Sequence, residues 1–389
     1  MRAEPEPPTP LGWPPGFGAG HRERSALLTL SQLRGLRPLA VHTTAWEVGS
    51  AERCVESVRR GRLGSVGDRE WLPRVDPAAA LARMAEAGAR LVTPADPEYE
   101  DPLLDLADPP ACLFLRGKPL TDGTDRVAIV GSRKCSDLGK AVAQDLGRAL
   151  VGAGLAVVSG AAQGIDAAAH RGALQAGGRT VAVLGSGIDV DYPVSSRDLL
   201  ASIVEHGTIV SEYPPGVPAG PQHFPARNRI VVALARALVV VEGEARSGSR
   251  ISVDHALELG REIFAVPGPV TSPLAETPLE MIRDGATMIR SAHDLLDDLG
   301  VDGSTLPPAP PDLDRDEERV WNALAGTVSV DAVARRAGIS VPDAVSTLVR
   351  LELRGLVAST GGRFERRFTP ATLTGDASQT EGVAPPPSG

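Results

Sequence analysis

The sequence predicts an α/β protein: a Rossmann-like, doubly wound, mostly parallel sheet, with a small N-terminal helical domain before it and a C-terminal winged helix after it. From residue 126 onward, short apolar runs alternate with helical segments, which is typical of a parallel sheet covered by helices on both faces. After a Pro-rich stretch at 302–312, three helical segments and a basic hairpin follow in the order of a winged helix-turn-helix.

The core strands are predicted from apolar runs that end in small or polar residues. These runs are 127–131, 155–160, 180–185, 208–212, 237–243 and 262–268. Helices are expected between them, for example over 138–152 and 164–176. Since crossovers between parallel strands are right-handed, the sheet should be doubly wound.

Composition shifts divide the chain into six segments. They are 1–20, predicted disordered; 21–120, an N-terminal helical domain and lead-in; 121–301, the Rossmann-like core; 302–312, a linker; 313–368, the winged helix; and 369–389, a disordered tail. The short helices of the second segment are expected over 21–62 and 76–88.

Overall charge and cysteine usage exclude several classes of protein. The net charge of −9 and the pI near 5.4 oppose a uniformly basic nucleic-acid binder, although screening permits a local basic surface. Cys54, Cys112 and Cys135 are scattered, so no disulfide framework or metal site is expected. Without a long apolar run or a secretion signal, the expected location is the cytoplasm, with no membrane contact.

Small and polar residues end the first three core strands. Gly131 to Arg133 follow the first strand, Ser159 and Gly160 the second, and Gly185 to Gly187 the third. In such folds ligands bind outside the carboxyl ends of the strands, and glycine lets backbone N–H groups approach an anion. Either these segments form an anion site, or they only make tight turns.

Known nucleotide and catalytic signatures fit poorly. The segment GSGIDV has Val190 where a dinucleotide fingerprint needs its third Gly, and the P-loop-like segment from Gly131 has Ala141 where Ser or Thr is required. No G-x-S-x-G elbow occurs. Asp166 and His170, four residues apart, are either ligands or an acid–base pair on one helix face or, as we favour, a helix cap and a structural histidine. We expect no catalytic residue, cofactor or metal.

The segment from His223 to Arg229 places an aromatic ring among cations. Between residues 223 and 251 the chain has five arginines (227, 229, 236, 246 and 250) and two glutamates (242 and 244). A ring that stacks on a base, beside guanidinium groups that bind phosphates, suits single-stranded nucleic acid. Alternatively, Phe224 is a buried core residue with arginines on the surface.

Seven ordered motifs resemble the DNA processing protein A family (DprA/Smf). They are VAIVGSR, VVSGAAQGIDAAAH, VAVLGSGIDVDYP, IVSEYPPG, HFPARNRIVVALA, VVVEGEARSGS and FAVPGPV. The resemblance implies a non-enzymatic, dimeric protein that binds single-stranded DNA without sequence preference, recruits the RecA recombinase during natural transformation and displaces single-strand-binding protein. It also implies that the DNA groove is lined by Arg133, Ser159, Gly160, Phe224, Arg227, Asn228, Arg229, Arg246, Ser247 and Gly248.

The sequence departs from the family pattern at three places. The stretch LAETPLEMIRDGA lacks the usual Gly and Asn, SGSRIS replaces SGSLIT, and residues 21–62 lack a clear helix-hairpin-helix glycine pair. Two other functions stay open. One is a nucleotide phosphoribohydrolase-type enzyme, although its P-G-G-x-G-T-x-x-E signature is missing. The other is a regulator that binds double-stranded DNA through the winged helix.

The winged helix does not show which kind of partner it binds. Its predicted recognition helix, 341–354, carries Asp343 and Glu352 against Arg350 and Arg354, which favours a protein contact. The wing arginines keep DNA open as a partner; they are Arg363, Arg366 and Arg367.

Overall fold

The computed structural model describes residues 12–121, 123–245, 247–301, 313–324, 328–353, 356–360 and 362–366. The chain divides into two compact units, residues 1–307 and 308–389. The predictions of disorder for 1–11 and 369–389, and of a linker at 302–312, lie outside the described residues. Within the described part, no helix is both long enough and apolar enough to cross a membrane.

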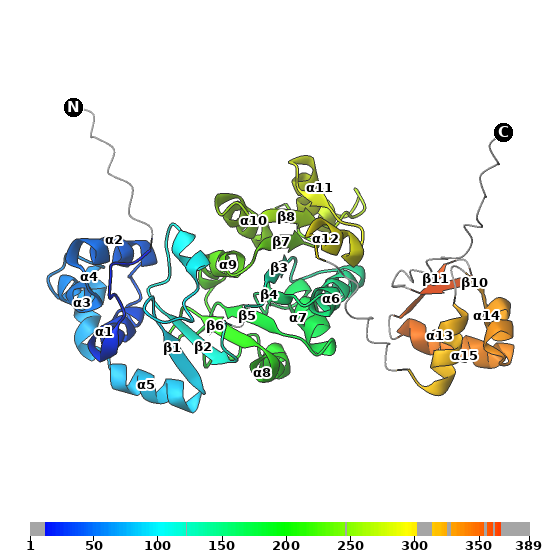
Figure 1. Ribbon diagram of the computed structural model, residues 1–389, viewed down its shortest axis with the longest axis horizontal. Helices are drawn as coiled ribbons and strands as arrows, with labels where there is room; N and C mark the ends of the chain where they lie inside the picture. Colours follow the sequence, from blue (N-terminus) through cyan, green and yellow to red (C-terminus); the bar gives the residue numbers. More distant parts are fainter. Residues whose placement is uncertain are drawn as a thin grey trace, which may run out of the picture. The chain divides into compact units, whose positions relative to one another are not determined.

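The first unit is built on one nine-stranded sheet with the order β1-β2-β6-β5-β4-β3-β7-β8-β9 (Figure 1). The strands are β1 Ala89–Val92, β2 Leu113–Gly117, β3 Arg126–Val130, β4 Ala156–Ser159, β5 Thr180–Leu184, β6 Thr208–Ser211, β7 Ala237–Val240, β8 Glu262–Ala265 and β9 Thr287–Met288. Strands β3 to β9 pair in parallel, whereas β2 pairs antiparallel with both β1 and β6. The predicted fold class is therefore confirmed.

Helices cover both faces of the sheet, as the fully buried central strands require. One face packs α6 Asp137–Gly152, α7 Ile165–Gln175 and α12 Ala292–Asp298 against β3, β4 and β7. The other packs α9 His223–Ala233, α10 Gly248–Glu258 and α11 Glu276–Arg283. Helix α8 Arg197–His206 covers the β5–β6 side (Figure 1). Short 3-10 turns are η2 Asp101–Asp105, η3 Val194–Ser196 and η4 Pro273–Ala275.

The N-terminal helices share a hydrophobic core with the sheet. They are α1 Gly20–Ser31, α2 Pro38–Val48, α3 Ala51–Arg59, α4 Val66–Trp71, η1 Leu72–Arg74 and α5 Pro77–Glu86. Buried Leu27 and Cys54 belong to the same cluster as Phe114 of β2. Consequently the expected lead-in contributes strands β1 and β2 to the main sheet, and this region is not a separate unit.

Residues 12–20 differ from the expectation of disorder. Trp13 stacks on Phe17 with ring centroids 4.5 Å apart, and Phe17 is only 2% exposed. Trp13 Nε1 also donates a hydrogen bond to the Tyr99 hydroxyl at 3.3 Å. These two aromatic residues anchor a segment whose Pro and Gly content alone suggested disorder.

The second unit is a three-helix domain with a small sheet. Its elements are α13 Arg315–Ala323, β10 Val328–Ser329, α14 Val330–Ala337, α15 Val341–Leu353, β11 Val357–Thr360 and β12 Arg363–Arg366. The strands are ordered β10-β12-β11, and α14 ends at Gly338 with a positive φ of 65°. This arrangement matches the predicted winged helix-turn-helix.

Candidate nucleic-acid interface

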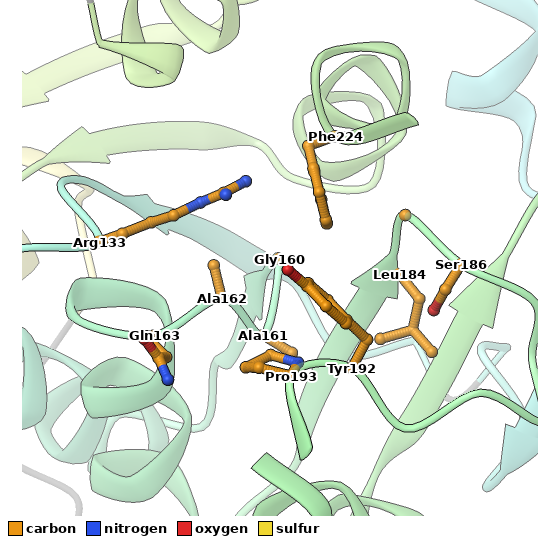
Figure 2. A pocket seen from close by; sticks show the side chains of 11 residues that line it. Arg133, Gly160, Ala161, Ala162, Gln163, Leu184, Ser186, Tyr192, Pro193 and Phe224 are labelled. Atoms are coloured by element: carbon orange, nitrogen blue, oxygen red, sulfur yellow. The ribbon is translucent and has the colours of Figure 1, made fainter. Parts of the chain in front are cut away.

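A small cavity of about 70 Å³ lies at the carboxyl ends of β4 and β5, below the start of α9 (Figure 2). Its lining comes from four segments of the chain. The lining residues are Arg133, Gly160, Ala161, Ala162, Gln163, Leu184, Gly185, Ser186, Tyr192, Pro193 and Phe224. The fold thus assembles the strand-end segments after β3, β4 and β5, together with Phe224, into one site, which we call the strand-end site.

A carboxylate fills the neighbouring position where this fold usually holds a nucleotide phosphate. Strand order reverses between β3 and β7, so the usual ligand position lies outside these two strands. There Glu242 accepts hydrogen bonds from the Ser136 backbone N–H at 2.8 Å and the Ser136 hydroxyl at 2.5 Å. Because Ser136 caps α6, the negative charge of Glu242 occupies the anion position of that helix.

Phe224 lies between a cation and a second aromatic ring. The Arg133 guanidinium carbon is 4.4 Å from the Phe224 ring centroid, and the Tyr192 ring centroid is 5.7 Å away (Figure 2). Phe224 is half-buried, whereas Arg133 and Tyr192 are exposed. A Cβ atom at Gly185 would lie 2.8 Å from Phe224 Cδ1, so glycine is what allows the ring to approach the end of β5.

Arg227 is buried and does not form part of the surface. It is 4% exposed; its Nη1 donates to the Gly160 carbonyl at 2.5 Å and also to the Val183 carbonyl, and its Nη2 lies 3.8 Å from Asp166 Oδ2. Burial lowers the pKa of Arg227 to about 10, although Asp166 opposes the shift. Arg227 therefore supports the floor of the strand-end site from inside.

Arg229 is likewise internal. It is 3% exposed and forms paired hydrogen bonds with the Glu212 carboxylate, at 2.9 and 2.7 Å, while its Nε donates to Asp108 Oδ1 at 2.9 Å. Burial disfavours the charged form, but Glu212 and Asp108 outweigh it and raise the pKa of Arg229 above its usual value. This arginine holds α9 against β6 and the loop after η2.

Asp166 and His170 are both buried, and neither lines the cavity. Burial raises the pKa of Asp166, opposed by Arg227, and Asp166 accepts a 3.4 Å hydrogen bond from the Ala162 N–H. Because Ala162 precedes the N-cap Gly164 and no side chain caps α7, the expected helix-cap role of Asp166 is wrong. His170 Nδ1 lies 2.6 Å from the Thr180 hydroxyl, and burial lowers its pKa to about 3. The histidine is thus neutral at physiological pH.

The remaining expected residues fall into a buried and an accessible set. Ser159 is fully buried and its hydroxyl donates to the Ile129 carbonyl at 2.6 Å. Asn228 Nδ2 donates to the Gly248 carbonyl at 3.2 Å, which joins the start of α10, with half-buried Ser247, to α9. Arg246 lies outside the described residues.

Four of the five arginines between residues 223 and 251 are described, and none of these four is both exposed and free of an ion pair. Arg227 and Arg229 are buried, Arg236 pairs with Asp125 at 3.2 Å, and Arg250 pairs with Glu280. In the described part of the strand-end site, the exposed cations without an ion pair are Arg133 and Lys134. The other described arginines of this segment are buried or ion-paired with residues of other segments, which sequence spacing does not reveal.

Two residues at this site were not expected from the sequence. Tyr192, 46% exposed, adds a second ring, and Gln163 contributes a polar group. The available signal was the Tyr-Pro pair at the end of the motif VAVLGSGIDVDYP, which places an aromatic side chain just beyond a strand end.

The recognition helix of the winged helix carries an apolar stripe among its exposed residues. Val341, Val345, Val349 and Leu353 follow one another at intervals of four residues on α15 and are between 41% and 83% exposed. Residues four apart lie on one face of a helix. Asp343, Ser346 and Arg350 of α15 are also exposed, and Arg350 lies 3.8 Å from the Asp314 and Glu317 carboxylates. The apolar stripe itself offers no hydrogen-bond donor to base edges, which favours a protein contact.

Comparison with known families identifies both units. The sequence profile described as DNA recombination-mediator protein A matches residues 90–300, and that described as DprA winged helix domain matches residues 304–363. Both units of the chain therefore match parts of one family.

Individual relatives agree with this assignment. Protein Smf of Escherichia coli (strain K12) is 37% identical over 306 residues, covering 76% of this chain and 82% of the relative. A putative DNA processing protein DprA of Mycobacterium tuberculosis is 36% identical over 352 residues, 82% of this chain and 90% of the relative. The X-ray structure of DNA processing protein A from Streptococcus pneumoniae superposes with a TM-score of 0.60 at 33% identity, covering 71% and 96% of the two chains.

Proposed function

Because the chain belongs to the DNA recombination-mediator protein A (DprA/Smf) family, we propose that it binds single-stranded DNA without sequence preference and delivers it to a recombinase. The family assignment confirms the resemblance drawn from the seven sequence motifs. The binding mode rests on the strand-end site, and the delivery role rests on the family description.

The grouping of Arg133 over the Phe224 ring, with the tilted Tyr192 ring beside it, is the observation that carries the binding proposal. Two rings and a guanidinium group line one cavity, with Phe224 only half-buried. An aromatic platform beside a cation binds unpaired bases and the phosphates between them, and it tolerates any base because every base has a π-face. Paired bases in a duplex do not offer these faces.

The ten residues expected at the DNA groove divide into two roles in this proposal. Direct contacts come from the accessible residues Arg133, Gly160, Phe224, Asn228, Ser247 and Gly248, together with Arg246. Positioning comes from the buried residues Ser159, Arg227 and Arg229. A Cβ atom at Gly160 would lie 1.8 Å from Arg227 Nη2. Only glycine at position 160 therefore leaves room for the Arg227 guanidinium group beneath the lining.

We propose a binding protein and not an enzyme. The Glu242 carboxylate at the start of α6 disfavours a nucleotide phosphate in the position that phosphohydrolases of this fold class would need. Incubation with nucleoside mono- and triphosphates should therefore give no turnover. Turnover that disappears on substitution of Gly131 or Gly185 would favour the enzyme instead.

The partners proposed from the resemblance are a RecA recombinase, single-strand-binding protein to be displaced, and a second copy of this chain in a homodimer. We propose the cytoplasm as the protein's location, where incoming DNA would be processed during natural transformation. Light scattering at several concentrations tests the dimer. Nucleation of RecA filaments on strands coated with single-strand-binding protein tests delivery, which should be faster with the protein present.

The decisive experiment compares single-stranded and duplex oligonucleotides of equal length across a salt series. Phe224→Ala should weaken single-strand binding by about 1–3 kcal/mol with little change in salt slope, while Arg133→Ala should lower the slope by about 0.7, one phosphate. Arg283→Ala, an exposed arginine of α11, is the matched control. Parental affinity in a Phe224→Ala protein that melts like the parent would reject the strand-end site.

A further inference from the structure

The N-terminal helical region carries a set of exposed arginines away from the strand-end site. Residues 21–75 contain ten arginines and six acidic residues, although the whole chain has a net charge of −9. Seven of these arginines are exposed and form no ion pair in the described part of the chain. Arg22 lies in α1 and Arg53 in α3, and the other five are here called the N-terminal arginine cluster: Arg34, Arg37, Arg62, Arg69 and Arg74.

Asp68 brings the segments of this cluster together. Its carboxylate accepts hydrogen bonds from the backbone N–H groups of Gly35 and Ser65, both at 2.8 Å. The loop carrying Arg34 and Arg37 therefore lies against the start of α4, beside the turn that carries Arg62. Asp68 is 4% exposed, and its carboxylate is hydrogen-bonded to these backbone donors. It therefore does not pair with the arginine side chains of the cluster.

Contacts around Gly61 place Arg69 with the same turn. A Cβ atom at Gly61 would lie 2.7 Å from Arg69 Nη1, so the guanidinium group rests on the turn next to Arg62. The nearby Arg59 and Arg60 differ, since both pair with Glu56, at 3.4 and 2.8 Å. The cluster is thus a surface built from three segments.

An exposed tryptophan adjoins these cations. Trp71, the last residue of α4, is 43% exposed, and the Arg74 guanidinium carbon is 5.6 Å from its ring centroid. This repeats the combination of Arg133 with Phe224 at the strand-end site, where the distance is 4.4 Å. An exposed ring beside several free guanidinium groups is suited to a strand of unpaired bases and phosphates.

Helix α5 connects the cluster to the strand-end site. It begins three residues after Arg74, and its ten residues span about 15 Å. Near its far end, Arg83 pairs at 2.9 Å with Asp189, in the loop that follows β5. That loop begins with Gly185 and Ser186, which line the cavity. The two surfaces are therefore one short helix apart.

We propose that the N-terminal arginine cluster and Trp71 form a second contact surface for single-stranded DNA, which only strands long enough to extend beyond the strand-end site can reach. This inference rests on the proposed single-strand binding. It also supplies the positive charge that binding to phosphates needs. The described strand-end site has two exposed cations without an ion pair, whereas the cluster has five. A protein that binds strands of any sequence depends on such phosphate contacts.

Strand length separates the two surfaces in an experiment. We compare oligothymidylates of about 6 and about 40 nucleotides; the first is within the roughly 4–16 nucleotides that one single-strand-binding domain covers, and the second is well above it. Arg62→Ala/Arg69→Ala should lower the salt slope by about 1.4 with the long strand and leave the short strand unchanged. Trp71→Ala should weaken long-strand binding about fivefold or more, and Trp71→Phe should restore it. Arg283→Ala/Arg290→Ala, which removes two exposed arginines elsewhere, should have no effect.

Three outcomes would overturn the proposal. One is a double variant that binds the long strand with the parental affinity and slope. Another is an equal loss with both lengths, which would mean that these residues act through the strand-end site. The third is an equal loss with a duplex of about 40 base pairs, which would remove the role of Trp71 in stacking. Phe224→Ala, measured on the short strand, reports separately on the proposed function.

Discussion

Arg227 offers the sharpest test of how the strand-end site is built, because its guanidinium group supports the site without reaching solvent. Arg227→Ala removes the donors to the Gly160 and Val183 carbonyls and leaves the Asp166 carboxylate buried without its cation. Removing one partner of a buried pair typically costs about 3–5 kcal/mol. We therefore expect the free energy of unfolding to fall by about this amount.

The Asp166 carboxylate explains most of that loss and provides the control. Burial already raises its pKa, and Arg227 opposes the shift, so the variant should leave Asp166 with a still higher pKa. Adding Asp166→Asn to Arg227→Ala removes the uncompensated charge and should restore part of the stability. Urea titrations of the parent, both single variants and the double variant at pH 7 measure this coupling.

Salt-dependent binding decides whether Arg227 also touches DNA. Since Arg227 is 4% exposed, Arg227→Ala protein that remains folded should keep the parental salt slope, unlike Arg133→Ala. An Arg227→Ala protein that unfolds at the parental urea concentration and loses about 0.7 of the salt slope would refute this internal role. That result would mean that the arginine binds a phosphate directly.

Three further predictions follow from the same contacts. Gly185→Ala should weaken single-strand binding towards the level of Phe224→Ala, because its Cβ would lie 2.8 Å from the Phe224 ring. Gly152→Ala is the control, since a Cβ there meets no atom within 4 Å. Equal affinities of the Gly185→Ala variant and the parent would contradict the packing of Phe224 on Gly185. A chain ending at residue 311 should keep its affinity for single strands, because α15 presents an apolar stripe; a tenfold loss, about 1.4 kcal/mol, would show a DNA contact in the winged helix. Burial lowers the pKa of His170 from 6.5 to about 3. Between these pH values the unfolded chain therefore binds a proton at His170 that the folded chain does not bind. The free energy of unfolding has its full value above pH 6.5, and below pH 6.5 it falls by about 1.4 kcal/mol per pH unit. In His170→Asn the melting temperature should depend less on pH over this range. An unchanged pH dependence of the melting temperature would show that His170 is protonated in the folded state.

The sequence by itself determined the order of elements and the edge of the sheet that holds the site. Apolar runs such as 180–185 alternate with helical segments, and a strand buried on both faces must be apolar throughout. The position of Gly160 and Gly185 after strands fixed them at the carboxyl edge, because parallel strands all end on the same side. Seven motifs in order were enough to indicate the family.

Tertiary structure alone decided what each charged side chain does. Arg227 and Arg229 stand two residues apart in a segment that looks like a basic surface, yet their partners Asp166, Glu212 and Asp108 come from distant segments. Likewise, the antiparallel addition of β1 and β2 and the anchoring of residues 12–20 depend on contacts far along the chain. Local sequence records charge and hydrophobicity, but burial and pairing arise only when remote segments meet.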